Sequence, residues 1–199
     1  MTQDFQLSAS RILILAGVVS IPIGLLNLVY PPSIDSNLWG YPYHPGTHVV
    51  VSILLVIVHL LKGYGFIGLS RLDGATRVVR WSVMVAILGF VVLAACEGIS
   101  ATMYGVPFDS PAAVKLNNGY GVGSMLMAIP SMIAGVVIIH KRLLVSSGRW
   151  SVFLSGAFMV FVVTPVLFMG RDWPAYLALT LWSLFYIWIG MALGRTARS

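Results

Sequence analysis

The strongest constraint on the fold is a succession of six apolar runs, each about twenty residues long, that fill nearly the whole chain. A helix of about twenty apolar residues is long enough to cross the hydrocarbon core of a bilayer. Only 9% of the 199 residues are charged, whereas soluble domains carry roughly 25% charged residues. We therefore predict an all-α membrane protein, a bundle of six transmembrane helices that forms a single domain over residues 1–199.

The expected transmembrane helices cover residues 12–30, 48–69, 81–100, 119–139, 150–169 and 174–193. Prolines, glycines and aromatic residues fill 31–47, which predicts a loop there. A second loop is expected over 104–118. The segment before the first run is weakly charged, and no small-residue cleavage site follows the run. We therefore expect the first run to be a retained helix, not a removable signal peptide.

Basic residues set the expected orientation. If the N-terminus is cytoplasmic, ten of the twelve lysines and arginines lie on the cytoplasmic side. They are Arg11, Lys62, Arg71, Arg77, Arg80, Lys141, Arg142, Arg149, Arg195 and Arg198. The positive-inside rule then predicts that both termini are cytoplasmic, and we expect a multi-pass protein of the plasma membrane. The same charges are spread over short segments, so we expect the lipid bilayer, and no nucleic acid, as partner.

A stripe of polar side chains runs along the second apolar run. At about 100° per residue, His48, Ser52, Leu55, His59 and Lys62 fall on one face of a helix. An ionisable side chain inside a bilayer is costly and marks a candidate functional site. Counting depth at about 1.5 Å per residue places His48 at the outer boundary and His59 near the bilayer centre. The same count leaves Lys62 close enough to the cytoplasmic face to snorkel.

Depth also suggests which polar groups meet. Glu97 lies near the outer end of the third run, at about the depth of His48, so these two are the expected pair and His59 is left without an identified partner. We predict a small polar pocket roofed by the two long loops. Its candidate ligand-binding residues are His44, His48, His59, Glu97, Asn117 and Asn118. The alternative is that these groups make hydrogen bonds between helices, which contribute roughly 0.6–2 kcal/mol each.

Metal and cofactor chemistry is not expected. His44 and His48 have the i, i+4 spacing of two ligands on one helical face, but Pro45 and Gly46 between them make a helix doubtful there. A bis-histidine haem needs two histidines at similar depth, and no pair meets that condition. The chain also has a single cysteine, Cys96, which excludes an intramolecular disulfide or a CxxC motif.

The sequence therefore favours a non-enzymatic membrane protein that binds a small ligand or partner, or supports a membrane assembly. One alternative is a proton-coupled small-molecule carrier that acts as an oligomer. A further alternative is an intramembrane lipid-modifying enzyme, although no GxSxG or HExxH motif is present. Small-x3-small patterns serve either internal packing or a homo-oligomer interface. These patterns are Gly119–Gly123, Ser131–Gly135 and Gly190–Gly194.

Two local features resemble small six-span bacterial integral membrane proteins: the segment YPYHPGTH at 41–48 and the Arg-Trp starts at Arg80 and Arg149. The resemblance supplies no site residues, and neither the fold nor the function is inferred from it. The two Arg-Trp starts lie 69 residues apart. They record either a duplicated helix pair or an interfacial anchor that arose twice.

Overall fold

The computed structural model describes residues 2–169 and 173–198, and over this range the chain is helical with only an isolated bridge between two loops. Four long helices come first: α1 (Thr2–Val29), α2 (Pro45–Ser70), α3 (Arg77–Ser100) and α4 (Pro111–Lys141). A composite fifth span covers Ser146–Leu167, and α7 (Trp173–Thr196) closes the chain. Six helices are long and apolar enough to cross a membrane. The predicted six-helix membrane fold is confirmed.

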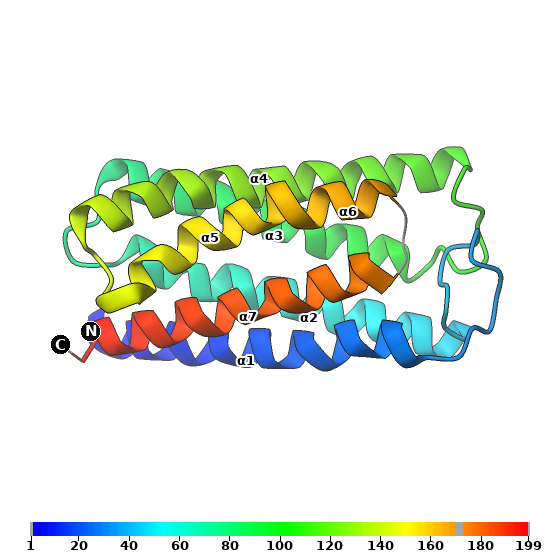
Figure 1. Ribbon diagram of the computed structural model, residues 1–199, viewed down its shortest axis with the longest axis horizontal. Coiled ribbons are helices and arrows are strands. Elements are labelled where there is room, and N and C mark those ends of the chain that lie inside the picture. The colour runs from blue at the N-terminus through cyan, green and yellow to red at the C-terminus, as the bar shows by residue number, and fades with distance from the viewer. Residues whose placement is uncertain (1, 170–172, 199) are drawn as a thin grey trace.

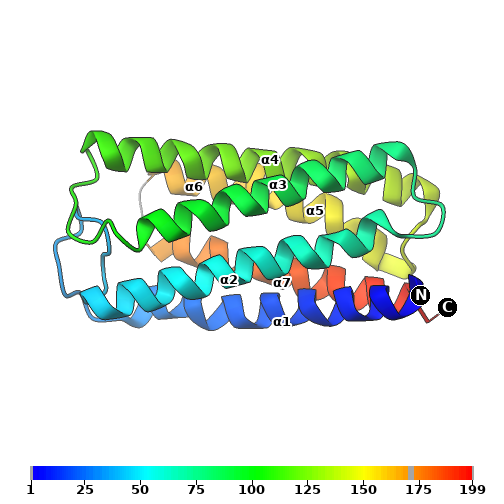
Figure 2. The same cartoon turned by 180° about the vertical axis from the view of Figure 1, so that it is seen from behind.

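The six spans form a closed ring. Each span packs against the next one in sequence, and α7 returns to pack along α1. Figure 1 shows both chain ends at one end of the bundle, which we call the terminal end, and the two longest loops at the opposite end, which we call the loop end. Figure 2 views the bundle from behind and shows α2 and α3 side by side on the face turned away from the viewer in Figure 1. Large apolar side chains such as Trp81 and Phe161 face outward, as lipid contact requires.

Small residues allow the neighbouring helices of the ring to approach closely. A Cβ atom added to Gly190 would lie 2.8 Å from the backbone oxygen of Ser10 on α1, and one added to Gly135 would lie 2.5 Å from the backbone nitrogen of Phe153. Gly123 likewise faces Leu93 of α3. Helices of the same chain therefore fill the faces of all three small-x3-small patterns. A homo-oligomer would need another surface.

Helix α4 begins earlier than the sequence suggested. The predicted loop 104–118 ends at Ser110, whose side chain accepts a hydrogen bond from the backbone nitrogen of Ala113. Pro111 occupies the first helical turn, where its missing N–H has no cost. Residues 111–118 of the predicted loop therefore form the first two turns of α4.

The fifth span is interrupted by one wide turn. It runs through the 3₁₀ segment η1 (Ser146–Trp150), α5 (Ser151–Phe158), the π-helical turn η2 (Met159–Val163) and α6 (Thr164–Met169). Pro165 cannot donate a backbone hydrogen bond and crowds the preceding turn, and a π turn accommodates this. The hydroxyl of Thr164 donates to the backbone oxygen of Met159 at 2.9 Å, which satisfies one carbonyl of the widened turn.

The two long loops at the loop end pair with each other. The backbone nitrogen of Trp39 donates to the oxygen of Val106 at 2.8 Å, and Gly105 returns a bond to the oxygen of Trp39 at 2.9 Å. A third backbone bond joins Phe108 to Asn37 at 3.0 Å. Together these bonds make the loops one layer across the end of the ring.

Candidate functional site

The ring of helices encloses a central cavity of about 540 Å³. Its wall is lined by side chains from α1, α2, α3, α4, η2, α6 and α7. The loop segment 39–43 lines the cavity at the loop end. Pockets that hold small molecules typically measure about 300–1,000 Å³. The cavity therefore has the volume of a small-ligand site and lies within the membrane-spanning part of the protein.

Trp39 fixes the roof of the cavity. Only 2% of its surface is exposed, and its indole N–H donates to the Ser100 hydroxyl at 2.7 Å. Its ring packs against Phe108 at a centroid distance of 5.3 Å and stacks on Tyr120 at 6.4 Å. The next residue, Gly40, has a φ of +98°, and a Cβ there would lie 2.6 Å from the Tyr104 ring. Glycine is required at that turn.

Tyr43 is a second aromatic residue of the roof. It is 3% exposed, and its hydroxyl has no hydrogen-bond partner among the described residues. Burial raises the pKa of Tyr43 above its ordinary value, with Tyr176 and Tyr30 adding to the effect. The phenol therefore stays neutral and presents an apolar ring with a polar tip to the outer end of the cavity.

The polar groups of α2 and α3 do not pair as the sequence suggested. Glu97 approaches His59, with its Oε1 atom 3.9 Å from Nε2 of the imidazole. His48 instead meets the backbone oxygen of Ser100 through Nε2 at 2.8 Å. The predicted pairing of Glu97 with His48 is therefore wrong, and His59 has the partner that depth counting failed to find.

The direction of the side chains explains this difference. In a helix each side chain tilts toward the helix N-terminus. The N-terminus of α2 lies at the loop end, whereas that of α3 lies at the terminal end (Figure 1). His59 therefore leans toward the loop end and Glu97 toward the membrane centre, so the two side chains converge. A depth count based on backbone positions alone misses both displacements.

The hydrogen-bonding capacity of the His59 ring is not fully used. Its Nδ1 atom is buried and has no hydrogen-bond partner among the described residues, and its ring lies 6.5 Å from that of Phe90. Glu97 is more firmly held, because the Tyr120 side chain of α4 hydrogen-bonds to both Glu97 and Ser100. Tyr120 was not among the predicted site residues. Its position three residues after Asn117, on the same helical face, was the signal that could have found it.

Lys62 lies in the interior. It is 2% exposed and lines the cavity, with Nζ 4.7 Å from the ring centroid of Trp182 and 4.4 Å from that of Tyr186. The prediction that Lys62 snorkels to the cytoplasmic face is wrong. Its side chain tilts toward the N-terminus of α2 and so away from the terminal end. Two aromatic faces from α7 then hold the ammonium inside the ring.

The other predicted site residues divide between the cavity and the surface. Asn117 lines the cavity. His44 precedes α2 as its exposed N-cap residue, with its ring 6.3 Å from that of Tyr30, and Asn118 is exposed on α4. Neither His44 nor Asn118 lines the cavity. Of the six predicted residues, the structure thus brings His48, His59, Glu97 and Asn117 to one site.

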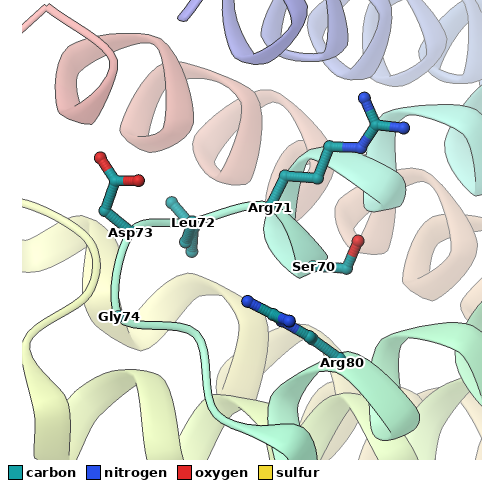
Figure 3. A pocket seen from close by; sticks show the side chains of 6 residues that line it. All are labelled: Ser70, Arg71, Leu72, Asp73, Gly74 and Arg80. Atoms are coloured by element: carbon teal, nitrogen blue, oxygen red, sulfur yellow. The ribbon is translucent and has the colours of Figure 1, made fainter. Parts of the chain in front are cut away.

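A second hollow, of about 410 Å³, lies at the terminal end around the loop between α2 and α3. Figure 3 shows Arg80 reaching from α3 toward this loop, whereas Arg71 points away from it toward α1. The Arg71 guanidinium there lies 4.0 Å from the centroid of the Phe5 ring. This hollow is open and is lined by six residues of the loop and of the adjoining helix ends, so the central cavity is the stronger candidate site.

Comparisons with known proteins place the chain near a carrier without assigning it to a family. No protein-family model matches the chain, and no solved structure matches it. A stretch of 120 residues is 28% identical to the "Proton-coupled zinc antiporter SLC30A9, mitochondrial" of Xenopus laevis. The match covers 55% of this chain and 20% of that relative, so the chain spans about a fifth of the length of the protein it resembles.

Metal-ligating side chains do not gather in large numbers. Among residues 2–169 and 173–198, no group of three or more histidine, cysteine, aspartate and glutamate side chains could hold a metal ion. The nearest approach to such a site in the cavity is the pair formed by His59 and Glu97.

The two buried histidines should respond oppositely to the same substitution. The His59 ring makes no hydrogen bond in the described part of the chain, because Nδ1 has no partner and Nε2 lies 3.9 Å from Glu97. His59→Leu should therefore raise the free energy of unfolding by about 1 kcal/mol. His48→Leu removes the bond to the Ser100 oxygen and should lower the free energy of unfolding by about 1 kcal/mol. Thermal unfolding of the purified variants in one detergent measures both changes. Shifts of the same sign would contradict the assignment of satisfied and unsatisfied rings.

Proposed function

We propose that the protein binds a small molecule in the central cavity, and that binding is its function at this site. The observation that carries the proposal is the convergence of ionisable groups from two helices on one cavity. His59 and Lys62 come from α2 and Glu97 from α3, and all three line the same cavity of about 540 Å³. Charged side chains inside a membrane protein usually face a cavity or a substrate pathway.

A purely structural role for these groups is less well supported. Interhelical hydrogen bonds would be expected to satisfy them pairwise. Yet Nδ1 of His59 has no hydrogen-bond partner in the described part of the chain, and the Lys62 ammonium faces the rings of Trp182 and Tyr186. Ser52 also lines the cavity. Groups held inside the ring in this way are suited to contact a ligand.

Two glycines allow a matched test of ligand binding. A Cβ added at Gly121 or at Gly98 meets no atom within 4 Å, so a larger side chain fits at each position. Gly121 lines the cavity and Gly98 does not. Gly121→Phe should therefore fill part of the cavity, while Gly98→Phe serves as the control.

The measurement is a thermal-shift screen of small amphiphilic compounds against the purified chain. A ligand at a hundred times its Kd adds about 2.7 kcal/mol to the free energy of unfolding, which raises the midpoint by several degrees. Compounds that act in the cavity should stabilise the native chain and Gly98→Phe but not Gly121→Phe. Equal shifts in all three proteins would place binding elsewhere and contradict the proposal.

A proton-coupled carrier is the second candidate. It is supported by the similarity to the mitochondrial proton-coupled zinc antiporter and by the contact between His59 and Glu97, two groups able to exchange protons, inside the cavity. As a carrier, the protein is proposed to act as a homo-oligomer. The interface between the copies would lie away from the helix faces around Gly123, Gly135 and Gly190, because other helices of the same chain cover those faces.

Zinc flux into proteoliposomes under an imposed pH gradient tests the carrier function. A carrier should lose most of the proton-driven flux on His59→Leu or Glu97→Gln, because each change removes one member of the pair. His140→Leu, at the terminal end of α4, is the control and should keep the flux. Flux that is absent in the native chain, or unchanged in both cavity variants, would contradict a zinc carrier.

We also propose that the terminal end faces the cytoplasm and that the host membrane is the plasma membrane. The arrangement of basic residues supports this orientation. Ser36 and Ser147 are exposed at opposite ends of the ring, so each can carry a single cysteine in a Cys96→Ser background. In intact cells a membrane-impermeant maleimide should label Ser36→Cys and spare Ser147→Cys. The reverse pattern would invert the topology.

A further inference from the structure

We propose that the ligand of the central cavity is an elongated amphiphilic carboxylate whose acidic group pairs with Lys62. This inference rests on the proposed ligand-binding function and adds the chemical class of the ligand. The feature that carries it is a buried ammonium inside the ring that faces two aromatic rings and no acidic partner at bonding distance.

Lys62 faces two aromatic rings and, among the described residues, no carboxylate within 4.0 Å. Nζ lies 4.7 Å from the ring centroid of Trp182 and 4.4 Å from that of Tyr186. Aromatic faces attract a cation through their quadrupole, by about 2 kcal/mol when the pair is desolvated. They carry no net charge, so they cannot neutralise an ammonium as a carboxylate can. An acidic group that enters the cavity can reach this ammonium, because Lys62 lines it.

The acidic side chain nearest in the cavity already has other contacts. Glu97 interacts electrostatically with Lys62, but its contact within 4.0 Å is with the His59 ring, at 3.9 Å from Oε1 to Nε2. Tyr120 also holds the Glu97 side chain by a hydrogen bond. Glu97 is therefore positioned at the middle of the cavity, where it leaves the ammonium of Lys62 accessible to the acidic group of a ligand.

The shape of the cavity favours a long ligand. His48 and Lys62 both line it, and they are separated by fourteen residues of α2, or about 21 Å along the helix axis. A volume of about 540 Å³ spread over that depth is narrow. Between the two ends the wall includes Leu55, Leu93 and Met159, so the body of the ligand meets mainly apolar side chains.

These features divide the ligand into two parts. The inner end of the cavity offers one cation with aromatic walls, which selects an acidic group. The rest of the wall combines the His59–Glu97 pair with aliphatic side chains such as Leu55 and Leu93. Burial of apolar surface against these aliphatic side chains favours an unbranched hydrocarbon body. A single-chain carboxylate meets both requirements, whereas an amine of the same length would bring a second positive charge next to Lys62.

Three ten-carbon compounds that differ only in the head group test the inference: decanoate, decanol and decylamine. Their binding is measured by calorimetry at neutral pH to the full chain in phosphatidylcholine nanodiscs, with empty nanodiscs as the reference for lipid partition. Decanoate should bind about tenfold more tightly than decanol, as expected when a desolvated charge finds its partner, and decylamine should bind most weakly.

Variants at Lys62 separate the head-group contact from the rest of the cavity. Lys62→Met should remove the preference for decanoate while decanol binding is retained, and Lys62→Arg should keep the preference. Lys115→Met, at an exposed position of α4, is the matched control and should behave as the native chain. If Lys62→Met fails to fold, the comparison of decanoate with decanol on the native chain and on Lys62→Arg still tests whether the cavity prefers an acidic head group.

The outcomes separate the two proposals. Equal affinity of the native chain for decanoate and decanol would overturn the carboxylate ligand and leave the binding function standing. A preference for decanoate that persists in Lys62→Met would overturn the assignment to Lys62. If none of the three compounds binds and no compound in the thermal-shift screen depends on Gly121, then the binding function itself fails.

Discussion

The structure depends on the cost of placing charge in hydrocarbon. A polar side chain that faced lipid would lose its solvation with no compensation, so the few ionisable groups of the spans must turn toward the inside of the bundle. The closed ring supplies that inside. Because α7 returns to α1, Lys62, His59 and Glu97 can share one enclosed space while the outer surface remains apolar.

Close helix packing and the cavity are complementary parts of this arrangement. Glycines at the helix contacts bring backbone against backbone around the circumference, which gives van der Waals stabilisation where lipid offers no hydrophobic drive. Larger side chains at those positions would separate the helices. The π turn of the fifth span places Met159 on the cavity wall, so a local irregularity next to Pro165 also contributes to the site.

The sequence predicts the six spans well, because an apolar run of about twenty residues has few other stable structures. It also selects four of the cavity residues: His48, His59, Glu97 and Asn117. The sequence does not predict the pairing of Glu97 with His59 or the location of Lys62, because both depend on the tilt of side chains on antiparallel helices. Trp182 and Tyr186 escaped it because their contact with Lys62 arises only when the last span packs back on the early ones.

Ser100 couples the roof of the cavity to its wall. Its hydroxyl accepts the bond from Trp39, and its backbone oxygen meets His48. The roof and the wall of the cavity therefore share one anchor, and it lies in the last turn of α3, the helix that carries Glu97.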